Sequence, residues 1–192
     1  NVYKSSSARE LVKCCVFTRD FYENPYINFF IEHYKKLGFD KIIILKTDDL
    51  NINYCQDTFT EVHKVENLGD ETLIKYDYII KNSNYDWVLS IDLDEILLLN
   101  KKYKNIKSYI YNNLKNNENI NTFYFRWGMI EKYDNLLSNY IEFNYIINNY
   151  SIYKNNFVKS MVKINEIDSI KSSHNFELKN KNCIYFENKI ID

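Results

Sequence analysis

Three acidic side chains interrupt an apolar run in the middle of the chain. The run extends from Trp87 to Leu99 and contains Asp92, Asp94 and Glu95. On an extended chain, residues two positions apart point the same way, so Asp92 and Asp94 would present carboxylates about 6–7 Å apart. Two neighbouring anions repel each other unless a cation joins them, and Mg²⁺ or Mn²⁺ prefers oxygen ligands. The spacing therefore predicts a divalent-cation site with positions left for substrate phosphates.

Other interpretations of these acids predict other chemistry. The acids can cap the strand and enter a solvated turn, with Glu95 at the start of a helix. A calcium loop of the EF-hand type would need glycine where Leu97 stands. A phosphatase of the Asp-x-Asp-x-Thr type would need Thr or Val where Ile96 stands. The capped turn is the main alternative to the cation site.

The acids follow a segment that is typical of a buried strand, and similar segments precede it. Each is apolar or alternating and ends in polar residues, and the four are 10–17, 41–45, 60–67 and 86–91. Open α/β sheets bind ligands outside the carboxyl ends of their strands, which is where Asp92 and Asp94 would lie.

Two helices are predicted between these strands. Asn24 suits an N-cap, Pro25 suits the first helical position, and Gly38 follows the last turn. The segment 69–83 carries a second apolar stripe with helical spacing. Strands that alternate with helices indicate an α/β domain with a largely parallel sheet.

The second half of the chain has weaker patterns. We expect a helix over 105–115, strands over 122–127 and 157–164, and a polar surface loop over 112–122. An Asn- and Tyr-rich stretch covers 133–156.

Length and charge restrict the function classes. A chain of 192 residues fits one domain. With 25 basic and 26 acidic residues, it lacks the basic field that drives binding to nucleic acids or anionic membranes. No apolar run approaches the roughly 20 residues of a membrane span, so we expect a soluble, cytoplasmic protein. The chain does not begin with Met and can be part of a longer polypeptide.

The four cysteines show no metal-binding spacing. They are scattered as Cys14, Cys15, Cys55 and Cys183. Free cysteines behave as small apolar residues, so we expect reduced, mostly buried thiols.

Three stretches together resemble the nucleotide-sugar glycosyltransferases of the GT-A fold, in particular families 2 and 92. The stretch 23–45 resembles the opening of that branch, with Phe29 and Phe30 in place of its Glu-Trp pair. The stretch 87–99 is similar to its Asp-x-Asp-Glu strand end. The stretch 122–130, followed by 158–176, resembles its Trp-containing strand and its later Lys-Ser and His segment.

The resemblance implies a fold and a division of the chain. It implies one α/β domain over 1–192 of the GT-A, Rossmann-like class, with a mixed, mostly parallel central sheet flanked by helices. Residues 1–99 would form the nucleotide-binding half, and residues 100–192 would form the acceptor-side half.

The resemblance also implies roles for individual residues. Asp94 would coordinate a divalent metal, Asp92 would contact the ribose or share the metal, and His174 would complete the metal shell. The remaining nucleotide contacts would come from Thr18, Arg19, Asp48, Asp49 and Lys159. Trp127 and Gly128 would line the acceptor side.

The implied activity is sugar transfer by a hexosyltransferase-type enzyme, dependent on Mn²⁺ or Mg²⁺. The donor would be a UDP-sugar, and the acceptor would be a hydroxyl of a glycan, a protein or a small molecule. In an inverting reaction a carboxylate deprotonates the acceptor, and Glu131 and Asp134 are the candidates. The alternatives are a non-catalytic sugar-binding, nucleotide-binding or interaction module with this fold, and a metal-dependent phosphatase or nucleotidyltransferase.

Overall fold

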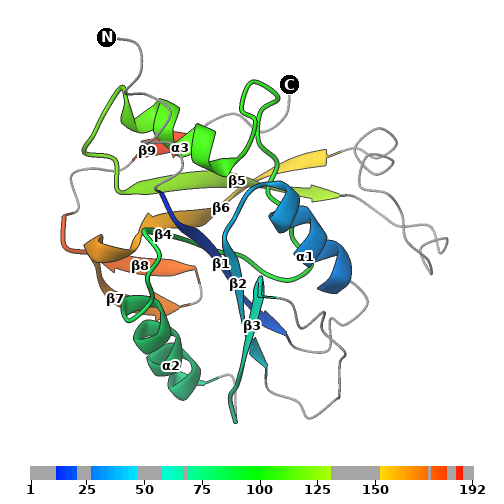
Figure 1. Ribbon diagram of the computed structural model, residues 1–192, viewed down its shortest axis with the longest axis vertical. Helices are drawn as coiled ribbons and strands as arrows, with labels where there is room; N and C mark the ends of the chain where they lie inside the picture. The colour runs from blue at the N-terminus through cyan, green and yellow to red at the C-terminus, as the bar shows by residue number, and fades with distance from the viewer. Residues whose placement is uncertain are drawn as a thin grey trace, which may run out of the picture.

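The described residues form a seven-stranded sheet with helices against it, and a separate pair of strands (Figure 1). The computed structural model describes residues 12–20, 27–46, 58–66, 69–130, 152–172, 174–180 and 185–187. No helix in these ranges has the length and apolar character needed to cross a membrane.

The first half of the chain alternates strands and helices, as its sequence pattern predicts. The elements are β1 (Cys14–Asp20), α1 (Ile27–Lys36), β2 (Lys41–Lys46), β3 (Thr60–Lys64), α2 (Asp70–Lys81) and β4 (Trp87–Ser90). The predicted strand over 10–17 is corrected, because β1 begins at Cys14 and extends to Asp20. The predicted N-cap at Asn24 lies outside the described residues.

The second half contributes the other edge of the sheet. Its elements are α3 (Ile106–Leu114), β5 (Thr122–Ile130), β6 (Ile152–Lys163), a short 3₁₀ turn (Ile164–Glu166), β7 (Ile167–Ser172), β8 (Asn175–Leu178) and β9 (Tyr185–Glu187). The helix over 105–115 is confirmed, and Asn105 and Ser108 cap its N-terminus reciprocally. The predicted surface loop over 112–122 is wrong at both ends, because α3 continues to Leu114 and residues 120–122 are buried.

The central sheet is mostly parallel. Its strand order is β3-β2-β1-β4-β6-β5-β9, and antiparallel pairing occurs only where β6 meets β4 and β5. This confirms the expected Rossmann-like class, a mixed α/β domain with a mostly parallel sheet flanked by helices.

The strand order reverses direction between β1 and β4. The chain builds β2 and β3 on one side of β1 and then places β4 on the other side. The two strands run parallel with Phe17 opposite Ser90, and the Ile91 amide donates to the Phe17 carbonyl at 3.1 Å. Such a reversal leaves a crevice at the carboxyl ends of the two strands, which is the usual ligand position in open α/β sheets.

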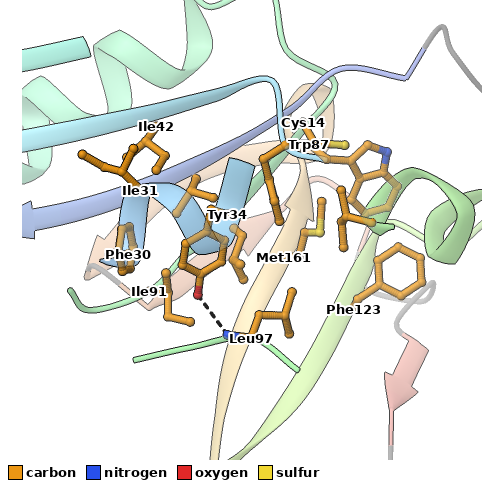
Figure 2. Close-up of a cluster of buried hydrophobic side chains, with 14 of the residues drawn as sticks. Cys14, Phe30, Ile31, Tyr34, Ile42, Trp87, Ile91, Leu97, Phe123 and Met161 are labelled. Atoms are coloured by element: carbon orange, nitrogen blue, oxygen red, sulfur yellow. Dashed lines mark hydrogen bonds between the residues drawn. The ribbon is translucent and has the colours of Figure 1, made fainter. Parts of the chain in front are cut away.

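Alternating side chains of the parallel strands fill two cores, one on each face of the sheet. Cys14 (Figure 2) and Val16 of β1 belong to the core on the face that α1 and α3 cover. Cys15 and Phe17 point to the opposite face, where α2, β7 and β8 pack. Each large apolar side chain buried in this way stabilises the fold by roughly 1.5–3 kcal/mol.

The two cysteines of β1 agree with the predicted reduced thiols. Cys14 and Cys15 are free and buried, and burial raises the pKa of both thiols. Cys55 and Cys183 lie outside the described residues.

Candidate active site at the carboxyl ends of β1 and β4

The acidic segment leaves β4 as a turn. The Glu95 amide donates to the Asp92 carbonyl, and the Asp92 amide donates to Oε2 of Glu95, both at 3.1 Å. Leu93 and Leu97 are buried in the core under the turn, whereas Asp94 is exposed. The extended geometry that would align Asp92 with Asp94 is therefore wrong. The turn instead brings Glu95 beside Asp92, since residues three apart meet across such a turn.

Helix α1 fixes the far end of this turn. The Tyr34 hydroxyl accepts a hydrogen bond from the Leu97 amide at 3.0 Å (Figure 2) and donates to the Glu95 carbonyl at 3.3 Å. Nε2 of His33 lies 2.9 Å from the Leu97 carbonyl, to which it can donate. Because Tyr34 is fully buried, these bonds tie the acidic turn to the core.

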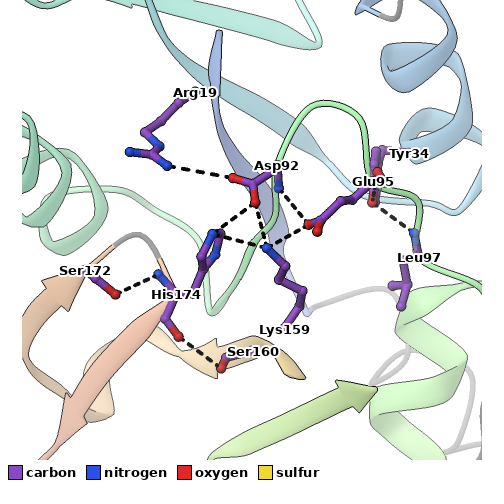
Figure 3. Close-up of polar contacts among 9 residues, drawn as sticks. All are labelled: Arg19, Tyr34, Asp92, Glu95, Leu97, Lys159, Ser160, Ser172 and His174. Carbon is purple, nitrogen blue, oxygen red and sulfur yellow. Dashed lines mark hydrogen bonds and ion pairs between the residues drawn. The ribbon is translucent and has the colours of Figure 1, made fainter. Parts of the chain in front are cut away.

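Lys159 lies at the centre of the polar cluster (Figure 3). Its ammonium nitrogen is 2.7 Å from Oδ2 of Asp92, 2.9 Å from Oε2 of Glu95 and 3.1 Å from Nε2 of His174. Strand β6 brings it there, because Ser160 pairs with Ser90 at the end of β4. The Lys159 and Glu95 side chains are only 10% and 9% exposed, so this is a largely desolvated ion pair.

His174 reaches the cluster from the connection between β7 and β8. Its Nε2 lies 3.1 Å from Oδ2 of Asp92, and its amide donates to Oγ of Ser172 at 3.3 Å (Figure 3). Nε2 can donate to Asp92 or accept from Lys159, depending on the tautomer. Nδ1 is buried and has no hydrogen-bond partner among the described residues.

The end of β1 supplies a second cation. A guanidinium nitrogen of Arg19 lies 3.8 Å from Oδ1 of Asp92, and both side chains are about one-third exposed. The neighbouring Thr18 is buried, and in the described part of the chain its hydroxyl has no hydrogen-bond partner. Thus β1 and β4 place opposite charges together at the point where the strand order reverses.

Trp127 lies against the cluster from β5. The Lys159 ammonium nitrogen is 5.1 Å from the centre of its ring, a cation–π distance. Between Arg126 and Gly128 the register with β6 is irregular, and such irregularities re-aim side chains. The predicted acceptor-side residue Trp127 is therefore in contact with the lysine, and Gly128 pairs with Lys154 just beyond it.

The four charged side chains of the cluster nearly neutralise one another. Burial alone would raise the pKa of Asp92, but the hydrogen bonds and charges of His174 and Lys159 outweigh it and hold that pKa well below its usual range. Burial raises the pKa of Glu95, and pairing with Lys159 opposes the rise. Asp92 therefore stays ionised at neutral pH, as a cation-binding carboxylate must.

The donor types of the cluster fit a divalent cation. Asp92 and Glu95 offer carboxylate oxygens and His174 offers an imidazole nitrogen, a set that suits Mn²⁺ or Mg²⁺. In their present arrangement, however, no three His, Cys, Asp or Glu side chains of the described residues are placed to hold a metal ion. The Lys159 ammonium lies among these donors, at the place where they converge.

The structure brings together only some of the predicted site residues. Arg19, Asp92, Lys159 and His174 meet in one cluster, and Trp127 flanks it. Asp94 is exposed and pairs with none of them. The remaining predicted nucleotide ligands and base candidates, which are Asp48, Asp49, Glu131 and Asp134, lie outside the described residues.

Glu95 is the residue of the cluster to which the sequence assigned no site role. The sequence feature that could have indicated its role is its position three residues after Asp92. This spacing brings two side chains together across a turn but separates them on a strand.

Comparison with known proteins yields weak structural likenesses. No protein-family model and no curated protein matches the sequence. One similar solved structure is S. aureus TarS, a glycosyltransferase, with 15% identity and a TM-score of 0.44; the match covers 58% of this chain and 34% of that one. The match thus spans about a third of that solved TarS chain. Another is CMP:2-keto-3-deoxy-manno-octonic acid synthetase complexed with CTP, a nucleotidyltransferase, with 7% identity, a TM-score of 0.44, and coverage of 80% of this chain and 75% of that one.

Proposed function

We propose that this protein transfers a sugar from a nucleoside-diphosphate donor, in the first instance a UDP-sugar, to a hydroxyl acceptor, with a divalent cation bound at the cluster. One observation carries the proposal: Arg19 and Asp92, from the carboxyl ends of β1 and β4, meet where the strand order reverses. That crevice is where open α/β sheets receive nucleotides.

The cluster has the charges that a sugar-nucleotide site needs. The leaving group is a diphosphate, whose negative charge grows as its bond to the sugar breaks. Lys159 and Arg19 supply positive charge at the crevice, and Asp92 and Glu95 pair with the lysine as long as no ligand is bound. Because Lys159 is nearly buried, its interaction with a phosphate is weakened less by water than that of a surface lysine.

Asp92, Glu95 and His174, together with the exposed Asp94, are the proposed residues for holding Mn²⁺ or Mg²⁺. When bound, the ion would act as a Lewis acid on the diphosphate and stabilise its developing charge. The acceptor hydroxyl must lose its proton to a carboxylate on the opposite face of the sugar, and Glu131 and Asp134 remain the sequence-based candidates.

A non-catalytic module is the second candidate function. The observation in its favour is that two acids and two bases of the cluster already pair with one another. A closed ion-pair cluster of this kind also suits a structural role. Such a module would bind a ligand without breaking a bond.

Calorimetry of UDP binding with and without Mn²⁺ tests the proposal. The wild type should bind UDP more tightly with Mn²⁺, and Asp92→Asn should lose at least tenfold in affinity. The control is Glu118→Gln, which removes the negative charge of an exposed side chain that is not part of the cluster. This variant should bind UDP as the wild type does. Unchanged UDP binding in Asp92→Asn would rule out the cluster as the donor site.

UDP release from a panel of UDP-sugars separates the two candidates. An active transferase hydrolyses its own donor slowly when no acceptor is present, so UDP accumulates with Mn²⁺. A pure binding module binds UDP and releases none from any sugar of the panel.

A further inference from the structure

The Lys159 ammonium group occupies a place that is built from metal-ligand atoms. Two carboxylate oxygens and one imidazole nitrogen lie 2.7–3.1 Å from Nζ. Oδ2 of Asp92 and Nε2 of His174 are 3.1 Å apart. Neighbouring ligands of an octahedral ion with bonds of about 2.1 Å lie roughly 3 Å apart, so the same two atoms could belong to one coordination shell.

Two buried atoms of this cluster leave binding capacity unused. Oε1 of Glu95 and Nδ1 of His174 have no hydrogen-bond partner among the described residues, and the Glu95 side chain is only 9% exposed. A buried carboxylate oxygen without a partner costs free energy, which a doubly charged ion in place of the ammonium group would recover. A single ammonium group therefore satisfies these donors only in part.

Lys159 and a divalent ion cannot occupy this place together. Both carry positive charge, and both would need the same oxygens at contact distance, so Coulomb repulsion excludes joint binding. Lysine is suited to leaving, because its ammonium group sits on a flexible four-carbon stem. Its contact with the Trp127 ring is a weak attraction compared with an ion pair.

We propose that Lys159 is a built-in competitor for the divalent cation. Its ammonium group holds the donor atoms of Asp92, Glu95 and His174 until an anionic ligand draws it away, and only then do these atoms accept the ion. The inference rests on the proposed function for the identity of that ligand, a nucleoside diphosphate. It makes cation and nucleotide binding mutually dependent, because the bound nucleotide must raise the affinity for the cation by the same factor by which the bound cation raises the affinity for the nucleotide.

Titration of Mn²⁺ without nucleotide tests the competition directly. The electron paramagnetic resonance signal of free Mn²⁺ reports binding with no need for activity. Lys159→Met, which keeps the stem but removes the charge, should bind one Mn²⁺ at least tenfold more tightly than the wild type. Adding Asp92→Asn to this variant should abolish the gain. The matched control is Lys163→Met on the same strand, paired with Trp87 at the opposite end of β4, and it should bind as the wild type does.

Equal Mn²⁺ affinity of Lys159→Met and the wild type would overturn the inference and make Lys159 a structural ion-pair partner. Lys159→Gln provides a second test if the Met variant does not fold, as judged by circular dichroism. A third test uses the wild type itself. Its affinity for Mn²⁺ should rise at least tenfold when UDP is saturating. Tight Mn²⁺ binding that UDP leaves unchanged would also overturn the inference. If the wild type bound no UDP, the proposed function would be wrong and a diphosphate would not be the ligand that displaces Lys159. The comparison of Lys159→Met with the wild type would still show whether Lys159 competes with Mn²⁺.

Discussion

Oδ2 of Asp92 lies 2.7 Å from the ammonium nitrogen of Lys159, although 67 positions separate the two residues in the chain. The contact exists because β4 and β6 are neighbours in the sheet, with Ser90 opposite Ser160. The acidic end of one strand and the lysine of the other therefore meet at a single point. The cluster also includes Glu95, which pairs with the same lysine.

Replacing the lysine should destabilise the fold when no metal is present. Lys159→Met leaves Asp92 and Glu95 without their shared counter-charge, and loss of one partner of a buried pair costs about 3 kcal/mol. The estimate stands at the low end of the usual range because Asp92 is 31% exposed and is partly solvated. Urea denaturation with EDTA present measures the loss, and Lys163→Met should change the free energy of unfolding by no more than about 0.5 kcal/mol. Equal losses in both variants would contradict the argument.

The parallel core of the fold was predictable from local patterns. Strand β2 and helix α2 are strongly patterned, and each lies within a few residues of its predicted bounds. The hairpin of β7 and β8 was missed, because its strands are short and only one residue in three or four is buried. Tertiary packing against α2, which no local pattern encodes, stabilises it.

The site was predictable in its position but not in its pairing. The strand-end rule places Asp92 at the carboxyl end of β4, where it meets Arg19 from the end of β1, and ligand binding at this point stays a prediction. The partnership of Glu95 with Lys159 depends on a turn and on the neighbouring antiparallel strand, so the spacing of the acids alone could not reveal it. The same turn explains why Asp94 is exposed.

Acid should weaken the fold through His33. Burial lowers the pKa of His33 below its ordinary value of 6.5, partly offset by its hydrogen bond to the Leu97 carbonyl. The unfolded chain therefore takes up this proton more readily than the folded chain. The stability that neutral His33 contributes is complete above pH 6.5 and is lost as the pH falls through 6.5 toward the folded pKa.

Denaturation at several pH values measures this effect. The free energy of unfolding of the wild type should fall between pH 7.5 and pH 5.5 more steeply than that of His33→Asn. Each unit by which folding lowers the pKa of His33 should add ~1.4 kcal/mol to the difference between the two proteins. Comparing the two proteins cancels the titration of Glu95, whose raised pKa acts with the opposite sign. Parallel curves for the two proteins would show that His33 is not the group responsible.

The turn after α1 requires glycine. Gly38 has a φ of +83°, and a Cβ atom there would lie 3.1 Å from Cβ of Asn105, the N-cap of α3. Gly38→Ala should therefore lower the free energy of unfolding by about 1–2 kcal/mol through backbone strain alone. Gly38→Asn is the matched control, because asparagine also brings a Cβ atom but tolerates the left-handed conformation, so it should lose less. A loss of similar size in both variants would mean that the left-handed conformation is not the cause.

Removing one hydroxyl group from α1 should loosen the acidic turn without opening a cavity. Tyr34→Phe leaves the buried Leu97 amide without its acceptor and the Glu95 carbonyl without its donor, at a cost of about 1–3 kcal/mol in stability. Because the turn positions Glu95 beside Lys159, UDP binding should weaken as well, even though Tyr34 is not a member of the charged cluster. Tyr78→Phe removes the same group from a side chain that is 69% exposed and should alter neither quantity. If Tyr34→Phe lost stability but bound UDP as the wild type does, the turn would hold Glu95 in place without this bond.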